Sequence, residues 1–170
     1  LYNRSSHDLY VKPFTLGECE EFLSNRGMNY SRQDVIASYM IFGGIPHYLK
    51  QLLKGKSLAQ NIDRLFFEFN SPLRREYKRL FSSVFKKSEK YVEVTELLGR
   101  HLYGLSRDEI CKFLGMQSGG NITKLLENLE SACFISSFTP VNSSVEFYRL
   151  TDFFILFYLR FVKDNDINDN

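Results

Sequence analysis

Four consecutive residues, Gly43-Gly44-Ile45-Pro46, have the composition of a turn whose backbone could lie against a ligand. Glycine has no side chain to keep a ligand away from the main chain, and it adopts left-handed conformations without strain. Proline suits the first turn of a helix, and the N-terminus of a helix is mildly positive. Two interpretations stay open: an ordinary turn between two helices, or a turn shaped for a ligand.

Basic residues gather in a second stretch, from Pro72 to Lys90. Seven cations stand against two anions, Glu76 and Glu89: Arg74, Arg75, Lys78, Arg79, Lys86, Lys87 and Lys90. Basic residues interleaved with aromatics are typical of surfaces that bind nucleic acid. The aromatics here recur at helical spacing, however, which indicates that they face a core. The basic face could therefore bind nucleic acid, contact a protein or be solvated.

A third set of polar residues lies in the second half of the chain. Asn121, Thr123 and Lys124 fall within a predicted helix at 119–131, and Arg149 falls within a predicted hairpin after it. These side chains could contact DNA, but the same helix carries two glutamates, and phosphate contacts require positive charge. Contact within the same chain or with a protein is therefore favoured over sequence-specific DNA binding.

The elements that must position these residues are mainly α-helical. Starts of helices are predicted at Thr15, Ser31, Pro46, Ser57 and Pro72, from N-cap residues and from prolines that suit a first turn. The helix from Ser31 is expected to end at Gly43-Gly44 and to carry Val35, Ile36, Tyr39 and Met40 on one face, and the helix from Pro46 to end near Gly55. A short strand is predicted near 8–12.

The second half contains three predicted helices followed by two strands joined by a turn. Ser106 and Glu109 form a predicted capping box for the second of these helices, and Ser118 is the expected N-cap of the third. The strands are expected in "FISSFTPV" and "VEFYRL", and "TDFFILFYLRFV" is expected to be a helix or buried segment. Three helices and a hairpin in this order predict a winged helix.

Several ordered blocks resemble the prokaryotic AAA+ family often called archaeal-type ATPases, which are related to STAND-like P-loop NTPases. These blocks are "VKPFTLGECEEFL", "YMIFGGIPHYL", "SLAQNIDRLFF", "LRREYKRLF" and "SGGNITKLLENLESACFI…FYRLTDFFILFYLRFV". The resemblance covers Leu1 to about Val162. In that family a P-loop ATPase core is followed by a helical lid and a winged helix. The resemblance implies a lid-type bundle at 1–86, with a remnant core strand near 8–12, and a winged helix at 87–163. The polar residues 164–170 are predicted to be a disordered tail.

The resemblance also implies roles for individual residues. The turn at Gly43, Gly44, Ile45 and Pro46 is similar to the lid motif that lies against adenine, which makes it a nucleotide-sensing turn in an intact protein. Arg4 could contact phosphate or a neighbouring subunit, or be a solvated terminal arginine. Because the sequence has no G-x-x-x-x-G-K-[ST] loop, this chain is not expected to hydrolyse ATP, whereas ATP and magnesium are expected for the intact protein.

Composition narrows the classes of function. A formal net charge of +2 gives no global attraction to nucleic acid. Three widely spaced cysteines without a CxxC pair indicate reduced thiols, no metal site and a cytoplasmic location. The predicted function is the regulatory part of a P-loop ATPase, in which the lid senses nucleotide and the winged helix contacts a partner. Expected partners are the ATPase core and a protein or a second copy, with no membrane; the alternative is a DNA-binding winged-helix regulator.

Overall fold

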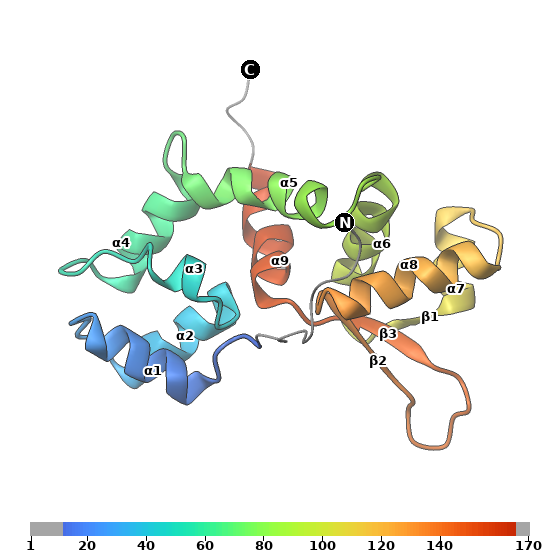
Figure 1. The fold of residues 1–170 in the computed structure, drawn as a ribbon, viewed down its shortest axis with the longest axis horizontal. Helices are drawn as coiled ribbons and strands as arrows, with labels where there is room; N and C mark the ends of the chain where they lie inside the picture. The colour runs from blue at the N-terminus through green and yellow to red at the C-terminus, as the bar shows by residue number, and fades with distance from the viewer. Residues whose placement is uncertain (1–11, 166–170) are drawn as a thin grey trace, which may run out of the picture.

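The computed structural model describes residues 12–165 and is mainly helical, with a small three-stranded antiparallel sheet (Figure 1). The helices and strands are α1 Leu16–Asn25, α2 Arg32–Phe42, α3 Pro46–Leu49, α4 Leu58–Ile62, α5 Pro72–Val84, α6 Glu89–Arg100, β1 Leu105–Ser106, α7 Arg107–Leu114, α8 Gly120–Ser131, β2 Ile135–Phe138, β3 Phe147–Leu150 and α9 Phe153–Phe157. Two helices continue as π-helix, α4 into Asp63–Phe67 and α9 into Tyr158–Val162, and a 3-10 turn follows at Lys163–Asn165. The predicted strand at 8–12 lies outside the described residues except for Lys12, which is in no regular element, and residues 166–170 of the predicted tail also lie outside them.

Local capping chemistry sets most of the helix starts. Within residues 12–165, four complete capping boxes form. In each, the N-cap side chain accepts from the amide three residues on, and that residue's side chain accepts from the N-cap amide: Thr15 with Glu18, Ser31 with Asp34, Ser57 with Gln60 and Ser106 with Glu109. The prediction for Ser118 was wrong. Helix α8 begins after Gly119, which makes no side-chain cap, and the Ser118 hydroxyl instead lies 3.5 Å from Asp108 Oδ1.

Two predictions about α2 and α3 need correction. The buried face of α2 consists of Val35, Ser38, Ile41 and Phe42, whereas Ile36 and Met40 are exposed. Periodicity alone could not separate these faces, because apolar residues occur nearly all round this helix. Helix α3 starts at Pro46 as expected but ends after one turn at Leu49 rather than near Gly55.

The three-stranded sheet joins the short strand between α6 and α7 to the hairpin that follows α8. The strands lie in the order β1-β3-β2, with Leu105 opposite Tyr148 and Ile135 opposite Leu150. Strands β2 and β3 were predicted. Strand β1 was not, because two residues carry no alternating pattern.

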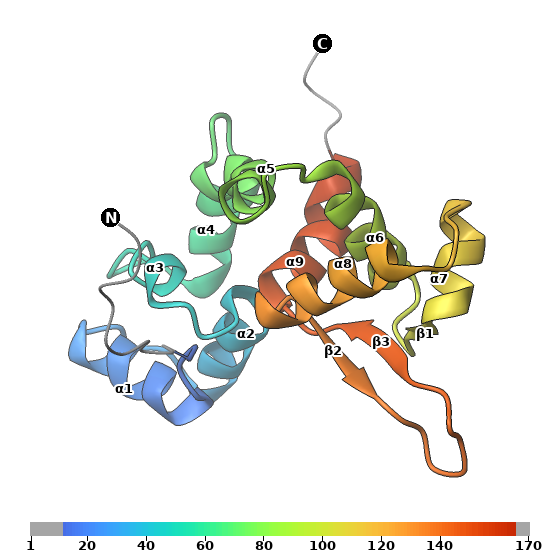
Figure 2. The same ribbon diagram turned by 45° about the vertical axis from the view of Figure 1, so that its right-hand side comes forward.

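Helix α9 and its π-helical continuation lie in the middle of the molecule (Figures 1 and 2). The Phe154 ring stacks on Tyr48 at 4.5 Å and lies 6.0 Å from Phe66, and Tyr158 stacks on Tyr77 at 4.1 Å. The buried residues form one continuous cluster that runs from α1 to the end of the α9 segment. The helices of the first half therefore pack on a segment that follows the sheet in the chain, and the division at residues 86/87 stays a prediction.

Asp152 caps α9 at the point where the chain leaves the sheet. Its Oδ1 accepts from the Ile155 amide at 2.8 Å. Burial raises the pKa of this carboxyl to about 6 from an ordinary value of 3.8, although hydrogen bonds from the Ile155 and Phe154 amides oppose the shift. Since the folded protein holds this proton more tightly than the unfolded chain does, the stability that Asp152 contributes is complete below the unfolded pKa. That stability is lost as the pH rises through about 6.

We expect Asp152→Asn to be more stable than the natural chain at neutral pH by roughly 1–3 kcal/mol, because asparagine keeps the cap without a charge to bury. Urea denaturation followed by circular dichroism between about pH 4 and pH 8 measures this. The natural chain should lose stability across that range relative to the variant. Parallel profiles for the two proteins would contradict the assignment, and Asp152→Ala, which removes the cap, should cost about 1 kcal/mol at low pH.

Candidate functional site

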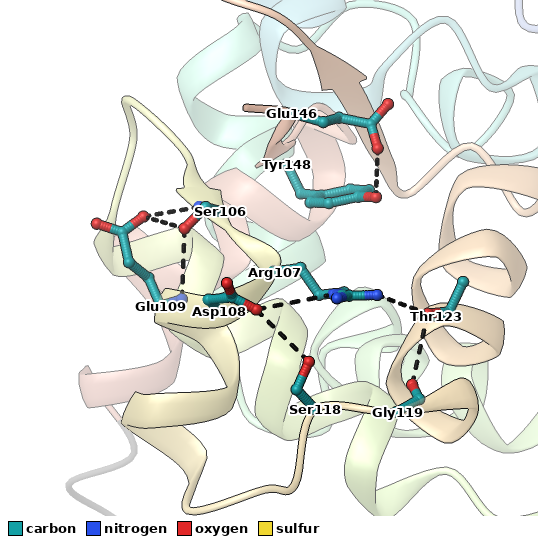
Figure 3. A network of polar contacts seen from close by, with 9 residues as sticks. All are labelled: Ser106, Arg107, Asp108, Glu109, Ser118, Gly119, Thr123, Glu146 and Tyr148. Atoms are coloured by element: carbon teal, nitrogen blue, oxygen red, sulfur yellow. Dashed lines mark hydrogen bonds and ion pairs between the residues drawn. The ribbon is translucent and has the colours of Figure 1, made fainter. Parts of the chain in front are cut away.

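The N-terminal ends of α7 and α8 meet beside the β2–β3 hairpin in a polar cluster (Figure 3). The first part of this cluster is the capping box of α7. The Ser106 amide and hydroxyl donate to Glu109 Oε2 at 2.8 and 2.7 Å, and the Glu109 amide donates to Ser106 Oγ at 3.3 Å. These hydrogen bonds, those with the Ser106 backbone first, lower the pKa of Glu109. The box fixes the direction in which α7 leaves strand β1.

Arg107, the first residue of α7, connects the two helices. Its Nη1 donates to Thr123 Oγ1 at 3.3 Å, and its Nε lies 3.9 Å from Asp108 Oδ1 (Figure 3). Thr123 Oγ1 in turn donates to the Gly119 carbonyl at 3.4 Å, one turn back in α8. Of the predicted contact residues, Thr123 therefore holds the start of α8 in place and has less freedom to bind an outside group.

The hairpin contributes the other side of the cluster. The Tyr148 hydroxyl donates to Glu146 Oε2 at 2.6 Å (Figure 3). Burial, and next the hydrogen bond to Glu146, raises the pKa of Tyr148 to about 12. A small open cavity of about 250 Å³ lies between Tyr148 and Arg107, lined also by Ser106, Asp108, Val145 and Glu146. Its volume is below the usual range for a small-molecule pocket, so this face is suited to surface contact.

The exposed charged side chains of this face include more acids than bases. Asn121 and Lys124 are exposed on α8, as is Arg149 on β3, where its guanidinium lies 5.2 Å from the centre of the Phe138 ring. The charged residues over α8, the start of α7 and the hairpin are Arg107, Lys124 and Arg149 against Asp108, Glu109, Glu127, Glu130 and Glu146. Acidic groups thus outnumber basic ones on the face that a DNA duplex would have to meet.

The predicted ligand turn is a tightly packed connection between α2 and α3. Gly43 and Gly44 have φ values of +64° and +70°, and the Gly44 carbonyl accepts from the Phe14 amide at 2.8 Å. A Cβ at Gly44 would overlap the Phe14 carbonyl oxygen. The group that lies close to the Gly44 main chain is therefore Phe14 of the same chain. Ile45 is half-buried and Pro46 is exposed.

The basic stretch lies mainly on α5, with its aromatics turned inward as predicted. Tyr77, Phe81 and Phe85 are buried. Arg75 and Arg79 are exposed, Arg74 is half-buried, and Lys78 lies in the same helix. Arg75 donates to the Asn70 side chain. Figures 1 and 2 show α5 on one side of the molecule and the tip of the hairpin on the other.

The remaining predictions concern Arg4, metal binding and the membrane. Arg4 lies outside the described residues. Among residues 12–165, no group of three or more His, Cys, Asp or Glu side chains is placed to hold a metal ion, and no helix in that range is long and apolar enough to cross a membrane. Comparisons with protein-family models, with curated proteins and with solved structures give no match to this chain.

Sequence reasoning missed the residues that join the two helices and the hairpin. Arg107, Asp108, Glu146 and Tyr148 were not predicted as part of a site. Arg107 directly follows the capping residue Ser106, so the sequence could have predicted that its side chain lies at the start of a helix. Its bond to Thr123, sixteen residues on, depends on how the α7–α8 connection folds back and has no local signal.

Proposed function

We propose that this chain is a regulatory part of a P-loop ATPase, in which a winged helix contacts a protein partner. The observation that carries the winged-helix part is the element order α6, β1, α7, α8, β2, β3 with the sheet order β1-β3-β2. Three helices and a hairpin that pairs with a short strand between the first and second of these helices support a winged helix, because this fold is a helix-turn-helix followed by a hairpin. Helix α8 is then the recognition helix and the β2–β3 loop is the wing.

Contact with protein is preferred over contact with DNA on electrostatic grounds. Binding to duplex DNA depends on cations that neutralise phosphates. The face made by α8, the start of α7 and the hairpin has an excess of carboxylates, and two of its basic groups already have partners in Thr123 and the Phe138 ring. Exposed apolar side chains occur in the wing loop instead, at Val141 and Val145. Such a surface is suited to a protein.

The lid function rests on the sequence resemblance. A lid helix that begins after a glycine turn can follow nucleotide state by moving between two arrangements, a population shift. The direct packing of α9 on Tyr48 and Phe66 supports the proposal, because it gives the first-half helices a mechanical connection to the winged helix. ATP and magnesium belong to the intact protein in this proposal, and the present chain binds neither by itself.

Fluorescence-anisotropy titration with a labelled DNA duplex tests the choice of partner. We expect no saturable binding at low salt, because the recognition face is not basic. Saturable binding whose affinity falls steeply with salt would support the DNA-binding alternative, and Lys124→Gln should then flatten the salt slope by about one unit. An Arg79→Gln variant on α5 serves as the control for non-specific attraction to the basic stretch.

The ATPase part of the proposal has a separate test. The complete coding sequence should encode a G-x-x-x-x-G-K-[ST] loop before these residues, and the complete protein should hydrolyse ATP, while this chain alone does not. A complete protein without that loop would end the ATPase proposal and leave the winged-helix contact to be judged by the DNA titration.

A further inference from the structure

A second cavity, unrelated to the recognition face, lies between α6 and the α9 segment. It has a volume of about 270 Å³ and is lined by Glu96, Gly99, Arg100, Leu102, Leu156, Leu159, Arg160, Lys163 and Asp164. Gly99 explains how closely its walls approach. A Cβ at this position would lie 2.7 Å from Leu159 Cδ1, so glycine lets Leu159 pack directly against the α6 backbone.

The cavity has an apolar part and two arginines without partners. Leu102, Leu156 and Leu159 supply the apolar part, and Leu102 is 47% exposed. Arg100 and Arg160 are exposed, and neither guanidinium makes a hydrogen bond or ion pair with the described residues. Five donors on each guanidinium are thus available to a ligand.

The remaining charges leave this cavity positive. Lys163 Nζ lies 2.6 Å from Glu96 Oε2, and both side chains are at least half-buried, so this pair neutralises itself. Asp164 is then the one acid of the lining set against Arg100 and Arg160. An anion entering the cavity would therefore meet a net attraction.

The backbone at Arg160 is also unusual. Arg160 lies within the π-helical segment Tyr158–Val162, whose wider turn keeps Tyr158 and Val162 buried while Arg160 lines the cavity. π-helical turns are rare and occur frequently at functional sites. The cavity, the two unpartnered arginines and the π-helical turn are independent observations that coincide at one place.

We propose that this cavity anchors an acidic side chain, Asp or Glu, from an extended or helical segment of a protein partner. Arginine binds a carboxylate through two parallel hydrogen bonds. The volume of about 270 Å³ lies below the usual range for a small-molecule site, about 300–1,000 Å³, so the cavity fits one side chain and not a whole cofactor. The three leucines would contact the apolar residues beside that acid. The inference rests on the proposed function, since it assumes a protein partner.

The experiment uses the peptide acetyl-Leu-Glu-Leu-amide, its Gln counterpart, and inorganic phosphate, each titrated into the ¹⁵N-labelled chain. We expect the Glu peptide to shift the Gly99 amide and the arginine Nε resonances, and to bind about tenfold or more tightly than the Gln peptide. The double variant Arg100→Gln with Arg160→Gln should abolish the preference for Glu. Arg32→Gln, an exposed arginine on α2, is the matched control and should leave it unchanged.

Equal binding of the two peptides, or a preference that survives in the double variant, would overturn the proposal. Shifts caused by phosphate without any preference between the peptides would also overturn it, because they would indicate a site for free anions. The peptide titration and the DNA titration test different statements. DNA binding by the recognition face would reject the protein-contact function without changing the peptide titration, and a negative titration would leave the DNA result as it stands.

Discussion

Replacing Phe154 with alanine is expected to lower the free energy of unfolding by about 3–5 kcal/mol. The Phe154 ring is fully buried and contacts Tyr48 and Phe66, so its removal leaves a cavity between α9 and the helices of the first half. Because the surrounding rings belong to several elements, the site has little freedom to collapse. Urea denaturation followed by far-ultraviolet circular dichroism measures the loss.

Phe69→Ala is the control for this prediction. Phe69 is 93% exposed, in the connection between the π-helical Asp63–Phe67 and α5, so the same substitution should change stability by no more than about 0.5 kcal/mol. A loss below about 1 kcal/mol for Phe154→Ala would show that α9 does not hold the first-half helices as the structure indicates.

Gly44→Ala is expected to cost about 2–4 kcal/mol. A side chain here meets two penalties. The first is the left-handed backbone, with φ at +70°, and the second is the Phe14 carbonyl oxygen, which the new Cβ would overlap. Relief requires Phe14 to move, which breaks its amide hydrogen bond to the Gly44 carbonyl. The same denaturation experiment measures this loss.

Two other glycines separate those penalties. Gly55 has φ at +80°, and a Cβ added there would meet no other atom within 4 Å, so Gly55→Ala should show the backbone cost alone, about 1–2 kcal/mol. Gly17 lies in α1 with open space around it and no left-handed φ, so Gly17→Ala should stabilise the chain by up to about 1 kcal/mol. A Gly44→Ala cost no greater than that of Gly55→Ala would refute the contact with Phe14.

The parts of the fold that depend on neighbouring residues could be predicted from the sequence. A capping box needs two side chains three residues apart, and those of Thr15 and Ser106 form as expected. The buried stripe Ile122, Leu125, Leu126 and Leu129 of α8 likewise follows one helical period. In both cases the information lies within a few residues of the chain.

The parts that depend on distant residues could not be predicted. Ile36 and Met40 looked like core residues, yet both are exposed, because α2 packs on α1 and α9 and buries Val35, Ser38, Ile41 and Phe42 instead. The need for glycine at position 44 comes from Phe14, thirty residues earlier. The bond from Arg107 to Thr123 and the cavity beside Gly99 likewise exist only once helices from different parts of the chain are packed together.

The position of α9 has a consequence for the order of folding during synthesis. Tyr48 and Phe154 are in contact but more than a hundred residues apart in the chain, and so are Tyr39 and Phe153. The ribosome makes helices α1–α5 long before the segment on which they pack. Until that segment is made, the aromatic side chains that pack on it remain exposed to solvent. Exposed apolar surface on an incompletely folded chain favours chaperone binding or aggregation. A nascent chain stalled before residue 153 should remain sensitive to protease in its first half.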